Sequence, residues 1–191
     1  AGEDARDLVT LVDRVALDGL LADAEVASDP ARLDWLLRHG ARPEARLHGQ
    51  ASPVVAALAQ GAAGIPRLRV LFAHGGSPAG RGGLASFLGA PSNARDAADA
   101  ERFALELLAR GADPFGASPA GDPPIALAVR LGWSHLMERL IAHGVDLDAR
   151  DSRGMSGLHL AAALGREDAL KRLVAAGAAP DRRAADGHGR A

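Results

Sequence analysis

Residues 151–179 read DSRGMSGLHLAAALGREDALKRLVAAGAA. This stretch predicts a turn, a short apolar helix, a glycine break, a second helix and a glycine stop. Much of the pattern recurs when it is moved back by 33 residues. The matching pairs are Gly154 with Gly121, Leu158 with Ile125, Leu160 with Leu127, Ala161 with Ala128, Gly165 with Gly132, Leu173 with Leu140 and Gly177 with Gly144. Similarity at a fixed period is typical of a stacked repeat array.

A glycine directly after a predicted helix recurs along the whole chain. The positions are Gly40, Gly75, Gly111, Gly144 and Gly177, which lie 35, 36, 33 and 33 residues apart. Glycine can adopt the left-handed conformation that closes the last carbonyl groups of a helix without a Cβ penalty. Stops in near-register therefore predict about five helix-turn-helix repeats.

Each of the last four stops is preceded by a shorter helix with its own start signal. These inner helices are predicted over 54–60, 84–88, 125–131 and 158–164. In the first repeat, Asp29 is the expected N-cap and Pro30 the first helical position, and the helix continues from Ala31 to His39. The apolar positions of 3–17 predict an N-terminal helix, so that 1–17 would cap one end of the array.

The second and third repeats are irregular. Extra residues at 61–64 and around 89–97 lie between the two helices of a repeat, so we expect them to project as loops. Phe87 and Leu88 stand where small residues are expected, which predicts different packing in the third repeat.

The composition favours helices packed through small side chains. Hydrophobic residues make up 48% of the 191-residue chain but aromatic residues only 3%, so the core must consist mainly of Ala, Leu and Val. A β-sandwich would favour more aromatic and β-branched residues. Because Lys171 is the only lysine and alanine is abundant, the composition also indicates a GC-rich bacterial genome.

Charge and hydropathy narrow the class of partner. The net charge is −2 and charged residues make up 24% of the chain, which favours neither nucleic acid nor a membrane surface. No run of about 18 apolar residues occurs, so we expect no membrane insertion by this segment. The chain has no Cys, which excludes disulfides and leaves both the cytoplasm and the periplasm open as compartments.

These motifs resemble the ankyrin repeat family over nearly the whole chain. The family pattern runs Gly-x-Thr-Pro-Leu-His-x-Ala-Ala, then a Gly after two more residues, an outer helix ending in Leu-Leu, and Gly-Ala-Asp. The closest copy here consists of Gly154, Ser156, Gly157, Leu158, His159, Ala161, Ala162, Gly165, Leu173, Val174, Gly177 and Ala178. The preceding copy has Ala126 in place of the His.

The resemblance implies an all-α fold, an ankyrin-type α-solenoid of helix-turn-helix repeats with short hairpin loops. It implies one domain over 1–191, in which 184–191 would open a truncated further repeat. His159 matches the family's structural histidine, which ties the turn through hydrogen bonds.

The seven histidines raise the question of a metal site. His39, His74 and His143 share one repeat position, so they are expected about 10 Å apart in a stack of helices. Metal-ligand bonds are only about 2 Å long, so these residues cannot share one ion. We expect them to interact with helix C-termini, and we expect no metal and no cofactor.

No pattern points to catalysis. Ser134 and His135 are adjacent, but neighbours on a helix point apart, and the glycine-rich 80–83 lacks the Lys-Ser/Thr of a phosphate-binding loop. We therefore predict no catalytic residue and no enzyme. Trp35 and Trp133 are the two tryptophans; Trp133 is expected to pack structurally against the adjacent repeat, although partial exposure of its side chain would suit a binding anchor.

The resemblance implies that a partner protein meets the concave surface, which the hairpin tips and the inner helices form. By motif position this surface contains Pro119, Ala120, Asp122, Arg130, Leu131, Ser152, Arg153, Met155, Ala163 and Leu164. Leucines and a methionine would form an apolar centre beside arginine and aspartate charges, which fits a protein interface.

The expected function is therefore a non-catalytic protein–protein interaction module. Two alternatives remain open. The chain could regulate or position a larger protein that is membrane-attached or bears an enzyme, or it could be an inhibitor that neutralises a toxin.

Overall fold

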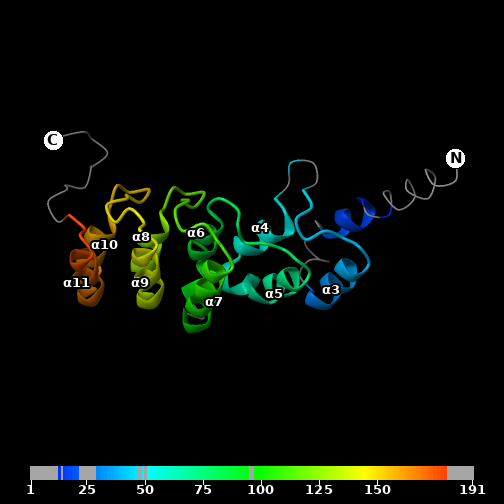
Figure 1. Ribbon diagram of the computed structural model, residues 1–191, viewed down its shortest axis with the longest axis horizontal. Helices are drawn as coiled ribbons and strands as arrows, with labels where there is room; N and C mark the ends of the chain where they lie inside the picture. The colour runs from blue at the N-terminus through cyan, green and yellow to red at the C-terminus, as the bar shows by residue number, and fades with distance from the viewer. Residues whose placement is uncertain are drawn as a thin grey trace. The chain divides into compact units, whose positions relative to one another are not determined.

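The computed structural model describes residues 13, 15–21, 29–46, 49, 51–94 and 97–179. Within these ranges the regular structure is helical and no strand forms (Figure 1). One isolated β-bridge joins Arg150 to Ser156. The predicted all-α class is therefore confirmed. Most of the helix predicted over 3–17, and the further repeat predicted to open over 184–191, lie outside the described residues.

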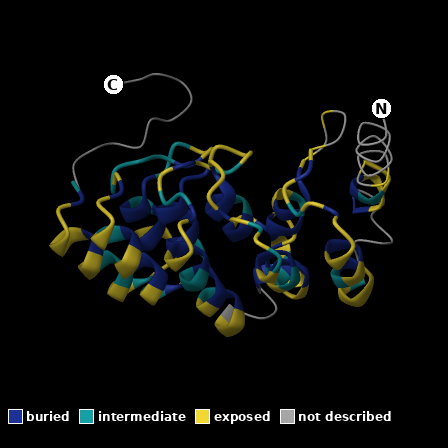
Figure 2. Ribbon diagram, turned by 45° about the vertical axis from the view of Figure 1, so that its right-hand side comes forward, coloured by how far each residue is buried: buried dark blue, intermediate teal, exposed yellow. Residues whose placement is uncertain are grey.

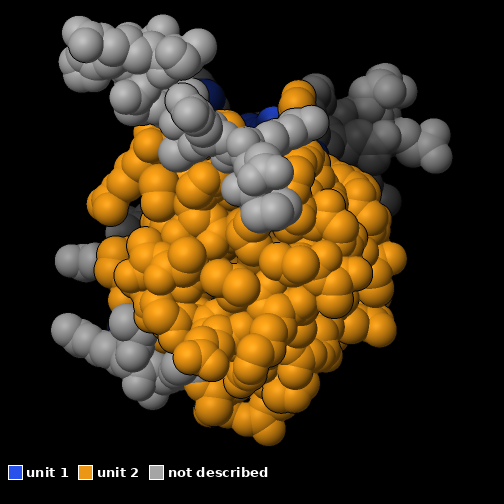
Figure 3. All heavy atoms as spheres, turned by 90° about the vertical axis from the view of Figure 1, so that its left-hand side faces the viewer, with its two compact units in different colours: residues 1–58, 63–77 blue, residues 59–62, 78–191 orange. Residues whose placement is uncertain are grey.

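The chain divides into two compact units (Figure 3). Unit 1 comprises Ala1–Leu58 and Ala63–Ser77, and unit 2 comprises Ala59–Ala62 and Pro78–Ala191. A single domain over 1–191 therefore stays a prediction.

In the described part of unit 1, both α3 and α4 pack against α5. Asp29 caps α3 by accepting a hydrogen bond from the Ala31 amide at 2.9 Å, and Pro30 opens the helix. The predicted N-cap and helix start are therefore confirmed. The three helices are α3 (Pro30–Arg38), α4 (Pro53–Leu58) and α5 (Ile65–Ala73).

Two polar contacts tie unit 1 together across long stretches of chain. The buried Asp18 carboxylate, on the helical segment 15–21, accepts hydrogen bonds from the Arg42 amide at 2.7 Å and from its guanidinium at 2.7 and 2.9 Å. His74 Nε2 lies 2.8 Å from Asp34 Oδ1, and this hydrogen bond lowers the pKa of the Asp34 carboxyl.

Unit 2 stacks three helix pairs side by side (Figure 1). The inner helices contact one another in the order α6, α8, α10, and the outer helices in the order α7, α9, α11. None of the helices in the described ranges is long and apolar enough to cross a membrane. The six helices are α6 (Gly83–Leu88), α7 (Ala97–Ala109), α8 (Pro124–Leu131), α9 (Ser134–Ala142), α10 (Gly157–Ala163) and α11 (Glu167–Ala175).

The core of unit 2 repeats with the sequence. Buried residues lie where helices face one another, whereas exposed residues gather on the loops and on the outward faces (Figure 2). In the last two repeats, small inner residues without exposed surface, Ala128 and Ala161, allow the inner helices to approach closely, whereas Phe87 occupies the equivalent position of the third repeat. The matching outer positions are fully buried leucines, namely Leu107, Leu140 and Leu173.

Each predicted helix stop is a glycine in the left-handed conformation. The φ angles are 103° at Gly40, 87° at Gly75, 88° at Gly111, 74° at Gly144 and 97° at Gly177. A residue with a Cβ is strained at such angles, so the periodic glycines determine where the helices end.

The extra residues of the second and third repeats do not project as loops, and that prediction is wrong. They form two short 3-10 helices, η1 (Gly61–Gly64) and η2 (Pro91–Ala94). Asn93 of η2 is fully buried and donates to the Phe87 and Leu88 carbonyls at 2.6 and 3.2 Å. It also accepts from the Ala62 amide at 2.8 Å. The Phe87 carbonyl also accepts from the Ala90 amide at 3.3 Å, so Asn93 adds a second donor there and supplies one to the Leu88 carbonyl at the end of α6.

Phe87 and Leu88 fill the interior of the third repeat instead of small residues. Both are at most 1% exposed. The Phe87 ring packs against Phe103 of α7 with their centroids 5.7 Å apart, a separation at which aromatic rings attract each other. The third repeat is therefore held by an aromatic pair.

Candidate functional site

Three loops of unit 2 lead into its inner helices. We call them L6 (78–82), L8 (112–123) and L10 (145–156), after the helix that each precedes. The residues two positions before these helices are Arg81, Asp122 and Met155. The three therefore occupy equivalent places in successive repeats.

L8 and L10 make the same turn with different side chains. In L10, Asp151 Oδ1 accepts hydrogen bonds from the Arg153 and Met155 amides, both at 2.9 Å. In L8, the equivalent Ser118 hydroxyl accepts from the Asp122 amide at 3.2 Å. A short polar side chain that binds the backbone a few residues ahead stabilises a tight turn. Both loops thus present a fixed tip.

An ionic network joins the two loops to α8. Arg130 donates to Asp122 Oδ2 at 3.2 Å and to Asp151 Oδ2 at 2.9 Å. The other oxygen of Asp122 accepts from the Ser152 amide at 2.8 Å. The two carboxylates are buried, whereas the Arg130 side chain is 38% exposed. Because the network crosses a repeat boundary, L8 and L10 cannot move independently while it is intact.

The network also determines the ionisation of Asp122. Burial alone would raise the pKa of this carboxyl, but the hydrogen bond from the Ser152 amide and the charge of Arg130 outweigh it. The pKa of Asp122 is lowered as a result, so the carboxylate stays ionised at neutral pH.

A groove of about 260 Å³ lies between the end of α6 and L8. Most of its wall consists of small or apolar side chains, and Arg130 and Asp122 are its charged members. The lining residues are Ala59, Ser86, Gly89, Ala90, Pro91, Ser118, Pro119, Ala120, Asp122, Leu127 and Arg130. A cavity of this kind can accept an apolar side chain from a binding partner.

Residues 95–184 match a family model described as ankyrin repeats in three copies. The matched range contains α7 to α11 and both L8 and L10. This part of the chain belongs to the ankyrin repeat family. Ankyrin repeats are generally protein–protein interaction modules. No curated protein matches the chain.

Most residues that the sequence places on the concave surface are accessible in this ankyrin repeat protein. Six are exposed: Pro119, Ala120, Ser152, Arg153, Ala163 and Leu164. Three are partly exposed: Arg130, Leu131 and Met155. Four of the predicted set line the groove together: Pro119, Ala120, Asp122 and Arg130. The structure thus brings part of the predicted set together, and a binding role for these residues stays a prediction.

Asp122 differs from the other predicted residues. It is 6% exposed, and its oxygens are engaged by Arg130 and the Ser152 amide. The side chain therefore orders the ankyrin loops and offers a partner little surface. The sequence could not show this because Ser152 lies 30 residues away.

Phe115 and Arg81 are exposed loop residues of unit 2 that the predicted set does not include. Phe115 is 63% exposed, and the Asp113 carboxylate fixes its backbone by accepting its amide hydrogen at 2.9 Å. Arg81 is exposed at the position equivalent to Asp122 and Met155. Counting back two residues from the predicted inner helix at 84–88 leads close to Arg81, so that signal was available.

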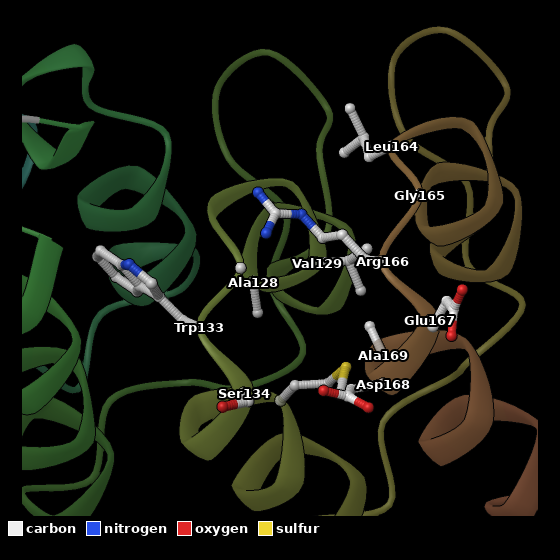
Figure 4. Close-up of a pocket in the computed structure, with 12 residues that line it drawn as sticks. Ala128, Val129, Trp133, Ser134, Leu164, Gly165, Arg166, Glu167, Asp168 and Ala169 are labelled. Carbon is white, nitrogen blue, oxygen red and sulfur yellow. The ribbon is translucent and has the colours of Figure 1, made fainter.

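A second cavity, of about 550 Å³, lies between the helix turns of the last two ankyrin repeats (Figure 4). The Arg166 side chain extends across it toward α8, where it donates to the Arg130 carbonyl at 3.1 Å. A Cβ added to Gly132 would lie 2.2 Å from Arg166 Nη1. Arg166 thus occupies the space that a side chain at Gly132 would need.

The helix starts explain why this second cavity is open. Glu101 of α7 caps α9 by accepting the His135 and Leu136 amides at 2.9 and 3.1 Å. The equivalent residue one repeat later is the shorter Ser134, and α11 has no side-chain cap. Replacement of a glutamate by a serine therefore leaves space at this boundary.

The aromatic residues behave differently from one another. Trp133 is 3% exposed, which confirms the predicted structural packing and gives it no surface to act as an anchor. Trp35 of unit 1 is 55% exposed and stacks on the His39 ring at a centroid distance of 3.9 Å. His39 Nδ1 also lies 2.7 Å from the Trp35 carbonyl, in the last turn of α3.

His159 makes a local contact at the start of its helix. The Ser156 hydroxyl lies 2.7 Å from His159 Nδ1, so His159 ties the start of α10 as the resemblance implies. Across the described ranges, no group of three His, Cys, Asp or Glu residues is placed to hold a metal ion.

Proposed function

We propose that unit 2 binds another protein along L6, L8, L10 and the inner helices, without catalysing a reaction. The observation that carries this proposal is the network in which Arg130 holds L8 and L10 at a fixed distance from α8. A surface ordered before binding loses less conformational entropy when the partner arrives. The ankyrin repeat assignment supports the same class of function.

The chemistry of the surface supports a protein partner. Pro119 and Ala120 border the groove, and Leu164, which directly follows α10, is 49% exposed. Arg153 adds an exposed charge to the tip of L10. Interfaces combine an apolar centre with a polar rim, and arginine is enriched in them.

Site-specific photocrosslinking tests the proposal. A photoreactive amino acid replaces Ala120 or Ala163 on the proposed surface, and Ala142 or Ala175 on the outer helices as matched exposed controls. We expect a protein adduct from the first two positions and none from the controls. Adducts formed only from α9 or α11 would place binding on the outer face and refute the proposal.

The finer alternatives share this surface. If the partner is an enzyme, the chain is an inhibitor, and the toxin-neutralising function applies. If the crosslink joins two parts of one polypeptide, the chain regulates or positions a larger protein. Mass spectrometry of the adduct identifies which sequence carries the crosslink.

A further inference from the structure

The acidic side chains of L8 and L10 all bind groups of the protein itself, including that of Asp146, which is exposed. Each of them accepts at least one hydrogen bond from a backbone amide, and two also bind Arg130. They are Asp113, Asp122, Asp146, Asp148 and Asp151. The loop carboxylates therefore serve mainly to shape the loops.

The arginines of the loops behave in the opposite way. Arg81 of L6 and Arg153 of L10 are exposed, and neither forms an ion pair with an acidic residue in the described ranges. Arg150 donates to the Gly154 carbonyl and is partly exposed. Arg81 and Arg153 thus present exposed guanidinium groups on the first and last of the three loops.

Along the chain, the uncharged tip of L8 lies between the loops that carry Arg81 and Arg153. L8 separates L6 from L10 along the chain, and its tip is Pro119-Ala120. The groove beside this tip is mostly apolar. Arg130 at the groove is already matched by Asp122 and Asp151, so it adds no unpaired positive charge.

The exposed arginines can attract a partner only once the two surfaces are in contact. Five aspartates of the loops outweigh the four arginines, counting Arg130, by one charge. The surface therefore creates no strong positive field that would steer a partner from a distance. A guanidinium that lacks a partner nevertheless pairs with a carboxylate through two parallel hydrogen bonds once the surfaces touch.

We propose that this surface binds a partner segment in which an apolar side chain is flanked by acidic residues. The apolar side chain enters the groove beside Pro119, and carboxylates on either side pair with Arg81 and Arg153. This inference rests on the proposed function and names the class of partner for the same surface. Exposed ion pairs contribute little affinity each, so they select among partners more than they tighten binding.

Selection from a displayed library of random peptides against the full chain tests this inference. We expect the enriched peptides to carry Asp or Glu on both sides of a Leu, Ile, Val, Met or Phe. The double variant Arg81→Glu/Arg153→Glu should enrich Lys or Arg at the same places. The conservative variant Arg81→Lys/Arg153→Lys should keep the acidic preference, and Arg139→Glu on α9 is the matched control at another exposed arginine.

Fluorescence anisotropy with one enriched peptide gives the size of the effect. Reversal of both arginines should weaken binding of the acidic peptide about tenfold, because two attractive contacts become repulsive. Arg139→Glu should change the dissociation constant less than twofold on the same scale. Replacement of the peptide's acidic residues by Gln should remove the difference between wild type and the double variant.

The outcomes separate this inference from the proposed function. Enriched peptides without an acidic preference, whose binding Ala120→Trp still abolishes, overturn the inference and leave the proposed function in place. If the double variant Arg81→Glu/Arg153→Glu enriches the same peptides as wild type, the inference is likewise overturned and the proposed function stays in place. Peptides that bind Ala120→Trp and Leu164→Arg as well as wild type, or a library that yields no binder, overturn both.

Discussion

Arg130 on α8 donates to Asp151 of L10 at 2.9 Å, and this bond crosses from one ankyrin repeat to the next. The same guanidinium binds Asp122 of its own repeat. Ankyrin-type arrays are stabilised by contacts between neighbouring repeats, and here one contact also fixes the spacing of two loops. The stability of the array and the shape of the proposed binding surface therefore depend on one side chain.

Arg130→Met is expected to destabilise the protein by about 2–4 kcal/mol, because two buried carboxylates lose their cation. Urea unfolding followed by circular dichroism measures the change. Arg139→Met is the matched control, since Arg139 is exposed on α9. Equal unfolding midpoints for the two variants would show that the network contributes nothing to stability.

Acid should weaken the protein through Asp122. Its pKa is lowered in the folded state from the ordinary value of 3.8. The carboxylate therefore contributes stability above the unfolded pKa, and this contribution is lost as the pH falls through the lower folded pKa. We expect the free energy of unfolding to fall below about pH 4 in wild type, and to fall less in Asp122→Asn.

Urea titrations at pH 7, pH 5 and pH 3 test this dependence. Asp122→Asn should be less stable than wild type at pH 7, and the difference should shrink at pH 3. Asp146→Asn in L10 is the control, because Asp146 is exposed and binds only a nearby amide. A difference between wild type and Asp122→Asn that stays constant over this range would contradict the assigned role.

Local features of the fold could be predicted from the sequence. Gly144 and Gly177 mark helix ends because a positive φ is a property of one residue and its neighbours. Asp29 and Pro30 similarly identify the start of α3. Each of these signals depends only on neighbouring residues of the chain. The helix ends and the repeat period could therefore be predicted from the sequence.

Features that depend on distant contacts could not be predicted in the same way. Asn93 reads as a turn residue, yet it is buried because it meets the Ala62 amide 31 residues earlier. Asp122 reads as a surface charge, yet it is buried against Ser152 of the next repeat. The repeat period was enough to predict where the loops of the site begin and end. Which loop carboxylates bind the protein itself, and which arginines are exposed, could be seen only in the structure.

Leu140→Ala should cost about 2–5 kcal/mol of stability, because Leu140 has no exposed surface and its truncation leaves a cavity. Val174→Ala on α11 is the matched control, since Val174 is 46% exposed. Thermal and urea unfolding measure both variants. An unchanged melting temperature for Leu140→Ala would contradict the assignment of this leucine to the core of α9.

Gly132→Ala and Gly165→Ala separate two kinds of glycine requirement. Both residues have positive φ, 77° and 64°. A Cβ at Gly165 meets open space, whereas a Cβ at Gly132 meets the Arg166 guanidinium. We expect Gly165→Ala to cost about 1–2 kcal/mol from backbone strain alone. Gly132→Ala should cost about 1 kcal/mol more, because Arg166 must leave the Arg130 carbonyl.

Urea unfolding of Arg166→Ala and of the double variant Gly132→Ala/Arg166→Ala checks the cause. With Arg166 removed, Gly132→Ala should cost no more than Gly165→Ala, because the clash is gone. If the excess persists in the double variant, the Arg166 contact is not its origin.

Asn93→Ala should destabilise unit 2 by about 2–4 kcal/mol, because the buried Leu88 carbonyl and Ala62 amide lose the Asn93 side chain as partner and the Phe87 carbonyl loses one of its two donors. Asn93→Asp is the informative comparison, since it keeps the shape and the acceptor for Ala62 but loses both donors. A loss in Asn93→Asp at least as large as in Asn93→Ala would assign the effect to the two donated bonds. If Asn93→Ala unfolds at the same urea concentration as wild type, the fold around η2 does not depend on this buried side-chain amide.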